Sequence, residues 1–178
     1  MKLNLFSIPV YIGNIEVDKI IIENKGFKKT WYSGTESSYS YQNIVNQKSG
    51  EYILEKINSL IGGDLPLHKT YQLSNIWENK YGEGDFQERH VHSQSHFSFV
   101  IYKKIESSKT VFFNPSEKLM GSYYGEHFIN NSNFFKEQFI PQCRQGQIIV
   151  FPSFIEHMVQ KHNNSTTIAG NVLITLLD

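Results

Sequence analysis

Hydrophobic residues in the first third of this chain follow a helical spacing. Between Glu51 and Ile61 they recur every three or four positions as one stripe, and a pair of glycines follows. This pattern predicts an amphipathic helix that packs on a sheet. Val17–Gly26 shows a shorter version of the same spacing and predicts a short helix, although its three consecutive isoleucines also fit a strand.

From Lys69 onward, short apolar runs separated by turn residues predict a sheet. Gly34–Asn43 and Ser116–Asn133 are polar and predict loops, and Gly82–Asp85 predicts a turn. Helices followed by many strands indicate a mainly β, α+β chain whose second half is a sandwich or barrel. The predicted strands are Leu5–Ile12, Thr70–Glu78, Phe97–Lys104, Thr110–Asn114, Gln147–Pro152 and Thr166–Leu177.

Length and composition narrow the possibilities further. The 178 residues fit a single domain over 1–178, with a supporting region over 1–63 and a β core over 69–178. Seventeen basic and 17 acidic residues balance, so charge gives no reason to expect nucleic acid or an anionic membrane as a partner. The single cysteine, Cys143, cannot form an internal disulfide, and neither a signal peptide nor a membrane span is recognisable. We therefore expect a cytoplasmic protein.

Candidate chemistry is concentrated around three histidines. His90 and His92 are two residues apart, so a strand would place both imidazoles on one face. Two neutral nitrogen donors on a stiff backbone are suited to holding a metal ion. The best third donor is His157, which follows the predicted strand that ends in Phe151-Pro152.

Three segments, Gly84–His92, Phe97–Lys103 and Gly146–Val159, resemble in this order the iron(II)/2-oxoglutarate-dependent oxygenases. The similarity is greatest to a branch common in marine bacteria and their phages, and it extends to Leu5–Val10 and to Trp77-Glu78-Asn79. It implies a double-stranded β-helix, or jelly roll, with the N-terminal helices packed on it and Fe(II) held in one mouth. The implied activity couples oxidative decarboxylation of 2-oxoglutarate to oxidation of a substrate by O2, typically hydroxylation.

The ligand set differs from that of many relatives, which have His-x-Asp where this chain has His90-Val91-His92. Three imidazoles leave the site one unit more positive than two imidazoles and a carboxylate, which could change its redox behaviour and metal preference. Glu88 precedes His90 by two residues and would share its face in a regular strand. A set of Glu88, His90 and His157 is therefore an alternative to His90, His92 and His157.

The resemblance also implies an arginine on the last strand that binds the distal carboxylate of 2-oxoglutarate in a bidentate contact. That position falls near Ser165, and no arginine occurs between Ser165 and Asp178. A hydroxyl could donate a hydrogen bond there but no charge. The residues that we expect around the co-substrate are Tyr102, Lys104, Ser165, Thr167 and Asn171, with Lys103 and Lys161 as further sources of positive charge.

Two other functions also fit this sequence. A three-histidine dioxygenase of cupin type would let the substrate itself chelate iron and would not use 2-oxoglutarate. A jelly-roll protein could also bind a ligand without catalysis. The substrate could be a small molecule or a protein or peptide side chain, and the oligomeric state is unknown.

Other conspicuous side chains have simpler interpretations. We expect His96 at a turn or strand edge, Cys143 as a buried or bystander thiol, and three phenylalanines in the core, Phe97, Phe99 and Phe151. A loop with Tyr123 and Tyr124 could cover the mouth of the site. The remaining histidines are expected at the surface: His68, His127 and His162.

Overall fold

The computed structural model describes residues 7–23, 26–41, 43–119, 122, 136–161 and 164–177. The long α-helix is α1 (Gln47–Ile61), and residues 117–119 and 122 are also α-helical. The short 3-10 segments are η1 (Val17–Lys19), η2 (Tyr39–Tyr41) and η3 (Gly62–Asp64). The strands are β1 (Tyr11–Asn14), β2 (Lys28–Lys29), β3 (Glu36–Ser37), β4 (Lys69–Tyr81), β5 (Gln87–His90), β6 (Phe97–Lys104), β7 (Thr110–Phe113), β8 (Gln138–Phe139), β9 (Gln147–Pro152), β10 (His157–Val159) and β11 (Ser165–Leu176).

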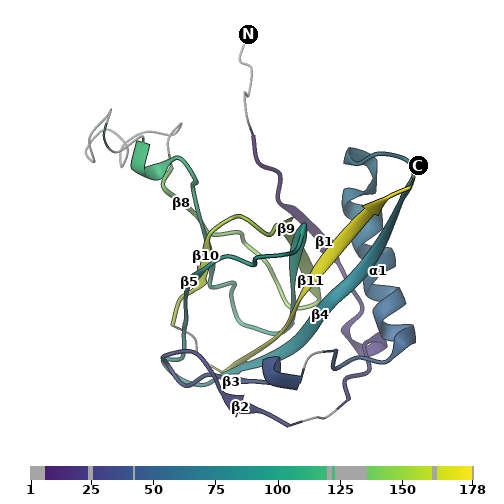
Figure 1. The fold of residues 1–178 in the computed structure, drawn as a ribbon. Helices are drawn as coiled ribbons and strands as arrows, with labels where there is room; N and C mark the ends of the chain where they lie inside the picture. The colour runs from purple at the N-terminus through teal and green to yellow at the C-terminus, as the bar shows by residue number, and fades with distance from the viewer. Residues whose placement is uncertain are drawn as a thin grey trace.

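The strands form two antiparallel sheets. The larger has the order β1-β9-β6-β11-β4-β3-β2, and the smaller has the order β5-β10-β7-β8. Strands adjacent in space are mostly distant in sequence, as in a jelly roll, and β4 and β11 form the longest ladder. Figure 1 shows β4 and β11 running side by side, with α1 along the outside of the larger sheet. The predicted mainly β fold is confirmed.

Alternate residues of β9 belong to two hydrophobic cores, one on each face of the larger sheet. Ile148 and Val150 pack against the α1 side, where Ile53 and Ile57 are fully buried. Ile149 and Phe151 point the other way and pack with residues between the two sheets. Both faces are covered, so this strand is apolar throughout rather than alternating. Cys143 is buried in the second core, as a free thiol.

The helix begins four residues before the predicted start. Asn46 caps it, because its side-chain oxygen accepts a hydrogen bond from the Ser49 N–H at 2.9 Å. The apolar stripe begins only at Ile53, so hydrophobic spacing alone misses the polar first turn. Among the described residues, none of the helices has both the length and the apolar character needed to cross a lipid bilayer.

The predicted helix over Val17–Gly26 is largely wrong. In its described residues, 17–23 and 26, the helical part is limited to η1, and Ile22 pairs with Val45 in an isolated β-bridge. Ile20 is buried against the α1 core, so tertiary packing outweighs the local spacing in this segment. Some boundaries also differ: β1 is shifted toward residue 14, β4 is longer at both ends, and the predicted loop over Gly34–Asn43 contains β3 and η2. The short strands β2, β5, β8 and β10 are additional to the predicted ones. The predicted loop over Ser116–Asn133 lies mostly outside the described residues, and its residues 117–119 and 122 are helical.

Close backbone packing at the centre of the larger sheet depends on Gly170 in β11. A Cβ atom built there would lie 2.5 Å from Cζ of Phe99 and 2.7 Å from the carbonyl oxygen of Asn75. Because neither distance is compatible with a side chain, glycine lets β11 pack tightly between β4 and β6. β4, β6 and β11 contribute most of the residues that line the cavity beside the three histidines.

Candidate metal centre

His90 and His157 face each other across two strands of the smaller sheet. His90 ends β5, His157 begins β10, and their Cα atoms are direct partners in the ladder. His92 lies beyond the end of β5, where its backbone N–H donates to the Ser153 carbonyl at 3.0 Å. The two neighbouring histidines therefore reach one point from a strand end and a tethered loop, rather than from one regular strand.

The three imidazoles form a compact cluster. One ring nitrogen from each lies within 4.8 Å of the others, and Nε2 of His92 is 3.2 Å from Nε2 of His157. Two nitrogens bound about 2.1 Å from one metal ion lie about 3.0 Å apart at a right angle and about 3.4 Å apart in a tetrahedron. The observed separation falls within this range, so the cluster fits a metal ion that both rings share.

Backbone carbonyls fix the orientation of two of these rings. Nδ1 of His90 lies 2.6 Å from the Glu88 carbonyl, and Nδ1 of His157 lies 2.9 Å from the Ile155 carbonyl. A carbonyl only accepts, so each Nδ1 carries the proton and donates it. The Nε2 lone pairs of both rings therefore point into the pocket, where that of His90 accepts from the Gln87 amide N–H at 3.2 Å. An Nδ1 proton held by a carbonyl, with Nε2 directed into a pocket, is the arrangement of a metal-binding histidine.

Burial keeps the cluster neutral. Desolvation, with a smaller contribution from His90, lowers the pKa of His157 to about 3 and that of His92 to about 4. Desolvation also lowers the pKa of His90. Only neutral imidazole offers a lone pair to a metal, so these three rings would need no deprotonation to bind one at neutral pH.

Two tryptophans cover the cluster. Trp77 of β4 stacks on His92 with ring centroids 5.8 Å apart, and Trp31 stacks on His90 at the same separation. Tyr39 meets Trp77 edge-on, at 5.0 Å. Trp31 has a φ of 65°, a left-handed conformation that is unfavourable for a bulky residue and is often found at functional sites.

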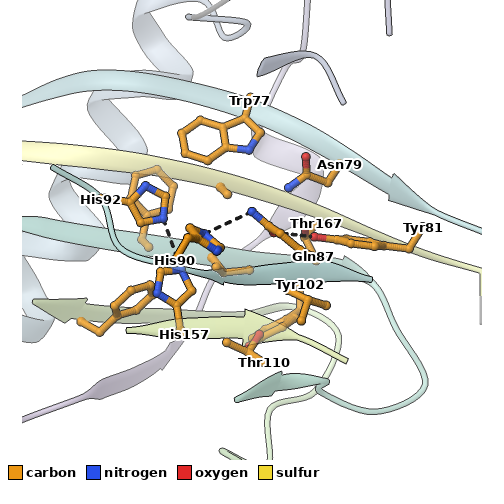
Figure 2. Close-up of a pocket in the computed structure, with 15 residues that line it drawn as sticks. Trp77, Asn79, Tyr81, Gln87, His90, His92, Tyr102, Thr110, His157 and Thr167 are labelled. Carbon is orange, nitrogen blue, oxygen red and sulfur yellow. Dashed lines mark hydrogen bonds between the residues drawn. The ribbon is translucent and has the colours of Figure 1, made fainter. Parts of the chain in front are cut away.

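A cavity adjoins the histidines in the space between the two sheets (Figure 2). Its volume is about 20 Å³, room for about one water molecule. Its walls are mainly aromatic and neutral polar. The polar residues around it, besides the histidines, are Trp77, Asn79, Tyr81, Gln87, Tyr102, Thr110 and Thr167.

Two of the five residues expected around a co-substrate line this cavity, Tyr102 and Thr167. The Tyr102 hydroxyl lies 3.0 Å from the Thr110 hydroxyl and 3.1 Å from that of Ser108. Lys104 is exposed at the end of β6, outside the lining.

The other two expected residues lie elsewhere on β11. Ser165 is buried at the start of the strand. Asn171 accepts a hydrogen bond from Ser98 and donates one to Asn75. Neither residue lines the histidine cavity.

No lysine or arginine occurs among the described residues that line the cavity. Lys103 forms an ion pair with Glu78 at 2.8 Å, and both residues line a different pocket. Lys161 is exposed. The positive charge expected near the co-substrate is therefore not supplied by any described lining residue.

The structure does not bring Glu88 into the cluster. A bulge in the β5–β10 ladder pairs His157 with His90 but Val159 with Gln87, which breaks the simple alternation along β5. Gln87 consequently faces the cavity, and its amide nitrogen lies 3.2 Å from Nε2 of His90. The Glu88 carboxylate instead accepts a hydrogen bond from the Tyr32 backbone N–H.

The cavity contains residues that sequence reasoning did not select. Trp77, Asn79 and Tyr81 alternate on one face of β4, and this spacing of two was visible in the sequence. Gln87 could not be recognised in this way, because its inward position depends on the bulge.

The other side chains singled out in the sequence lie at a strand edge, at the surface or in the core. His96 lies at the edge of β6, where its Nδ1 accepts from the Ile174 N–H at 2.9 Å. His68 is exposed, and Phe99 and Phe151 are in the core as predicted, while Phe97 is half-buried. The predictions for His127, His162, Tyr123 and Tyr124 lie outside the described residues.

Comparison with known proteins adds a family match. A sequence model of the family described as "Putative 2OG-Fe(II) oxygenase" matches residues 75–169. This segment is more than half of the chain and contains all three histidines and the described lining of the cavity. No curated protein shows a significant match.

Solved structures with a similar fold share little sequence. A viral collagen prolyl hydroxylase from Paramecium Bursaria Chlorella virus-1 has a TM-score of 0.50 and 12% identity, over 81% of this chain and 80% of that one. A prolyl-4-hydroxylase from Pseudomonas putida has a TM-score of 0.48 and 12% identity, over 88% and 79%. An oxidoreductase of the 2OG-Fe(II) oxygenase family from Burkholderia pseudomallei has a TM-score of 0.47 and 11% identity, over 72% of this chain but only 51% of its own.

Proposed function

Because this chain belongs to the 2OG-Fe(II) oxygenase family, we propose that it is a non-haem iron(II) oxygenase in which His90, His92 and His157 bind the iron. The supporting observation is the cluster itself: three neutral imidazoles, two with Nδ1 protons fixed by backbone carbonyls and one pair of Nε2 atoms 3.2 Å apart. Imidazole is a suitable ligand for iron.

Iron together with 2-oxoglutarate and O2 supplies the oxidising chemistry when bound, and the protein residues hold and shield these groups. His157 is 3% exposed, and Trp31 and Trp77 cover the other two rings. Water is therefore largely kept from the ligands. Three ligands on one side of an ion leave further coordination positions for a chelating co-substrate.

The cavity offers neutral hydrogen-bond donors for 2-oxoglutarate. We propose that Tyr102 and Thr167 contact it, since both line the cavity and burial raises the pKa of Tyr102, which keeps its hydroxyl protonated. The free volume of about 20 Å³ is too small for the whole molecule, so binding requires these side chains to move. We do not assign a contact with 2-oxoglutarate to Lys104, Ser165 or Asn171, because these residues lie outside the lining of the cavity.

The decisive experiment is an anaerobic titration of 2-oxoglutarate into the Fe(II)-loaded protein. Bidentate chelation should produce a visible charge-transfer band that saturates. Iron binding without any band at saturating 2-oxoglutarate would contradict the proposal.

Paired variants then identify the co-substrate contacts. Tyr102→Phe removes a hydroxyl inside the cavity, and we expect it to weaken 2-oxoglutarate binding about five- to tenfold, the usual effect of one neutral hydrogen bond. Lys104→Met removes an exposed charge outside the lining and should change the affinity less than twofold. A large loss in Lys104→Met would show that this lysine supplies the missing charge.

A three-histidine dioxygenase that does not use 2-oxoglutarate is the second candidate. The specific observation in its favour is the absence of lysine and arginine among the described lining residues, since a buried dianion without a counter-charge is costly. Its signature would be oxygen uptake with thiol or diketone substrates in the absence of 2-oxoglutarate.

The proposal extends to the substrate and the reaction outcome. We propose a small molecule or a peptide side chain, with hydroxylation as the outcome. A cytoplasmic location agrees with the free thiol of Cys143.

A further inference from the structure

An indole N–H in the metal-site cavity has no hydrogen-bond partner. Trp77 is 1% exposed, its Nε1 atom is buried, and no described acceptor lies within hydrogen-bonding distance. Buried donors are rarely left unpaired in folded proteins, because each one loses its hydration without compensation. An unpaired donor that lines a cavity is therefore a sign of a ligand that supplies the acceptor.

The Trp77 ring is held firmly in this position. It stacks on His92 with an interplanar angle of 30° and meets Tyr39 edge-on. The backbone of Trp77 pairs with Ala169 of β11 at the centre of the larger sheet. The indole cannot easily turn to find another acceptor, so the donor is preorganised.

Two amide side chains direct further N–H groups toward the same space. The Asn79 oxygen accepts a hydrogen bond from the Ser37 hydroxyl at 2.6 Å, which assigns the amide nitrogen to the cavity side. The Gln87 oxygen accepts from the Tyr81 hydroxyl at 3.1 Å, so the Gln87 nitrogen faces His90. Figure 2 shows the nitrogens of Trp77, Asn79 and Gln87 turned toward one space beside His90.

Each amide nitrogen carries two N–H groups, so one contact does not exhaust it. Gln87 uses one toward Nε2 of His90, and Asn79 has one toward the Tyr81 hydroxyl. Each amide thus retains an N–H beside the indole N–H of Trp77. This set of converging donors, which we call the N–H pocket, carries no formal charge, and its two amide oxygens accept from the Ser37 and Tyr81 hydroxyls.

We propose that the N–H pocket of Trp77, Asn79 and Gln87 binds a carboxylate oxygen of the 2-oxo acid co-substrate next to the metal. The inference rests on the proposed function, since it takes the 2-oxo acid as the ligand of the cavity. Preorganised neutral donors can hold an anionic oxygen without a counter-ion, as in an oxyanion hole. These donors would provide part of the stabilisation of the anionic oxygen that the charge of a lysine or arginine would otherwise provide. Trp77 acts here as a binding residue and not only as cover for His92.

The chain offers a matched pair of variants for the test. It contains two tryptophans, and both stack on a site histidine with a buried, unpartnered Nε1. Only Trp77 lines the cavity. Trp77→Phe removes the N–H but keeps an aromatic ring over His92, and Trp31→Phe makes the same change outside the cavity.

Both variants are titrated anaerobically, first with Fe(II) and then with 2-oxoglutarate, and the charge-transfer band is recorded. We expect Trp77→Phe to raise the Kd for 2-oxoglutarate about tenfold, the effect of one buried hydrogen bond to a charged group, and to leave the Kd for iron within about threefold. Trp31→Phe should change neither constant more than twofold. Because Trp77 is then the only tryptophan, its fluorescence in Trp31→Phe should change along the same binding curve.

Gln87→Met is a second and independent variant. It removes the amide N–H that faces His90, so 2-oxoglutarate should bind several-fold more weakly while iron binds equally well or more tightly. A purely structural role of Gln87 would weaken both. An unchanged Kd for 2-oxoglutarate in Trp77→Phe, with the wild-type band intact, overturns the inference alone. Absence of any band in the wild-type protein overturns the proposed function itself.

Discussion

Acid should destabilise the metal-free protein through its buried histidines. The pKa values of His92 and His157 are lowered to about 4 and about 3, whereas an unfolded chain has histidine pKa values near 6.5. Between these limits the unfolded chain binds protons that the folded chain does not. The free energy of unfolding therefore falls as the pH decreases from 6.5 toward 4.

The size of the effect follows from the same shifts. Each histidine contributes a slope of about 1.4 kcal/mol per pH unit in this window. Between pH 6.5 and pH 4.5, with the unfolded histidine half-protonated at the start, each loses about 2 kcal/mol and the pair about 4 kcal/mol. This is a large part of the roughly 5–15 kcal/mol that stabilises an ordinary domain. The lowered pKa of His90 acts in the same direction.

Urea unfolding of the chelator-treated protein at pH 6.5 and pH 4.5 measures this loss. His157→Gln removes one buried imidazole while other titrating groups stay the same, so the loss between the two pH values should be about 2 kcal/mol smaller than in the wild type. His92→Gln should give a similar difference. If His157→Gln loses as much stability as the wild type on acidification, the ring is not a desolvated neutral imidazole in the folded protein, and the reasoning is refuted.

Two further predictions concern the metal and the packing of the larger sheet. His157→Ala should weaken Fe(II) binding more than 100-fold in equilibrium dialysis. Glu88→Gln should leave the Kd for iron within about threefold, because the Glu88 carboxylate accepts a hydrogen bond from the Tyr32 backbone N–H. Equal losses in the two variants would show that Glu88 is a metal ligand. Gly170→Ala should lower the free energy of unfolding by about 1–3 kcal/mol through overpacking, while Gly63→Ala, with nothing within 4 Å of its new Cβ, should not lower it, as urea denaturation can show.

Elements with a strong local pattern could be predicted from the sequence. The stripe that begins at Ile53 predicts the helix, and the apolar run Ile148–Phe151 predicts the strand over Gln147–Pro152, because in each case the hydrophobic pattern lies in one continuous segment. Val17–Gly26 could not be predicted correctly, since its fate depends on a bridge between Ile22 and Val45. The isoleucine triplet fits an extended segment, but the local spacing does not identify Val45 as the partner.

The candidate site shows the same division. His90, His92 and His157 could be selected from their spacing and order, and the structure brings them together. The bulge in β5 could not be foreseen, because it arises from pairing with β10. It decides that Gln87 faces the cavity while Glu88 binds the Tyr32 backbone, and it thereby changes which neighbour of His90 can act in the site.

If His90 and His157 bind iron as proposed, their placement on neighbouring short strands would make the lifetime of the protein depend on iron supply. β5 has four residues and β10 has three, so the smaller sheet has few hydrogen bonds of its own. A metal ion shared by these strands would cross-link them and slow local opening. Amide exchange in β5 and β10 should then be slower with iron bound, and iron-starved protein should be cleaved first at this sheet. Proteolysis in the cell would in this way remove the copies that have no metal.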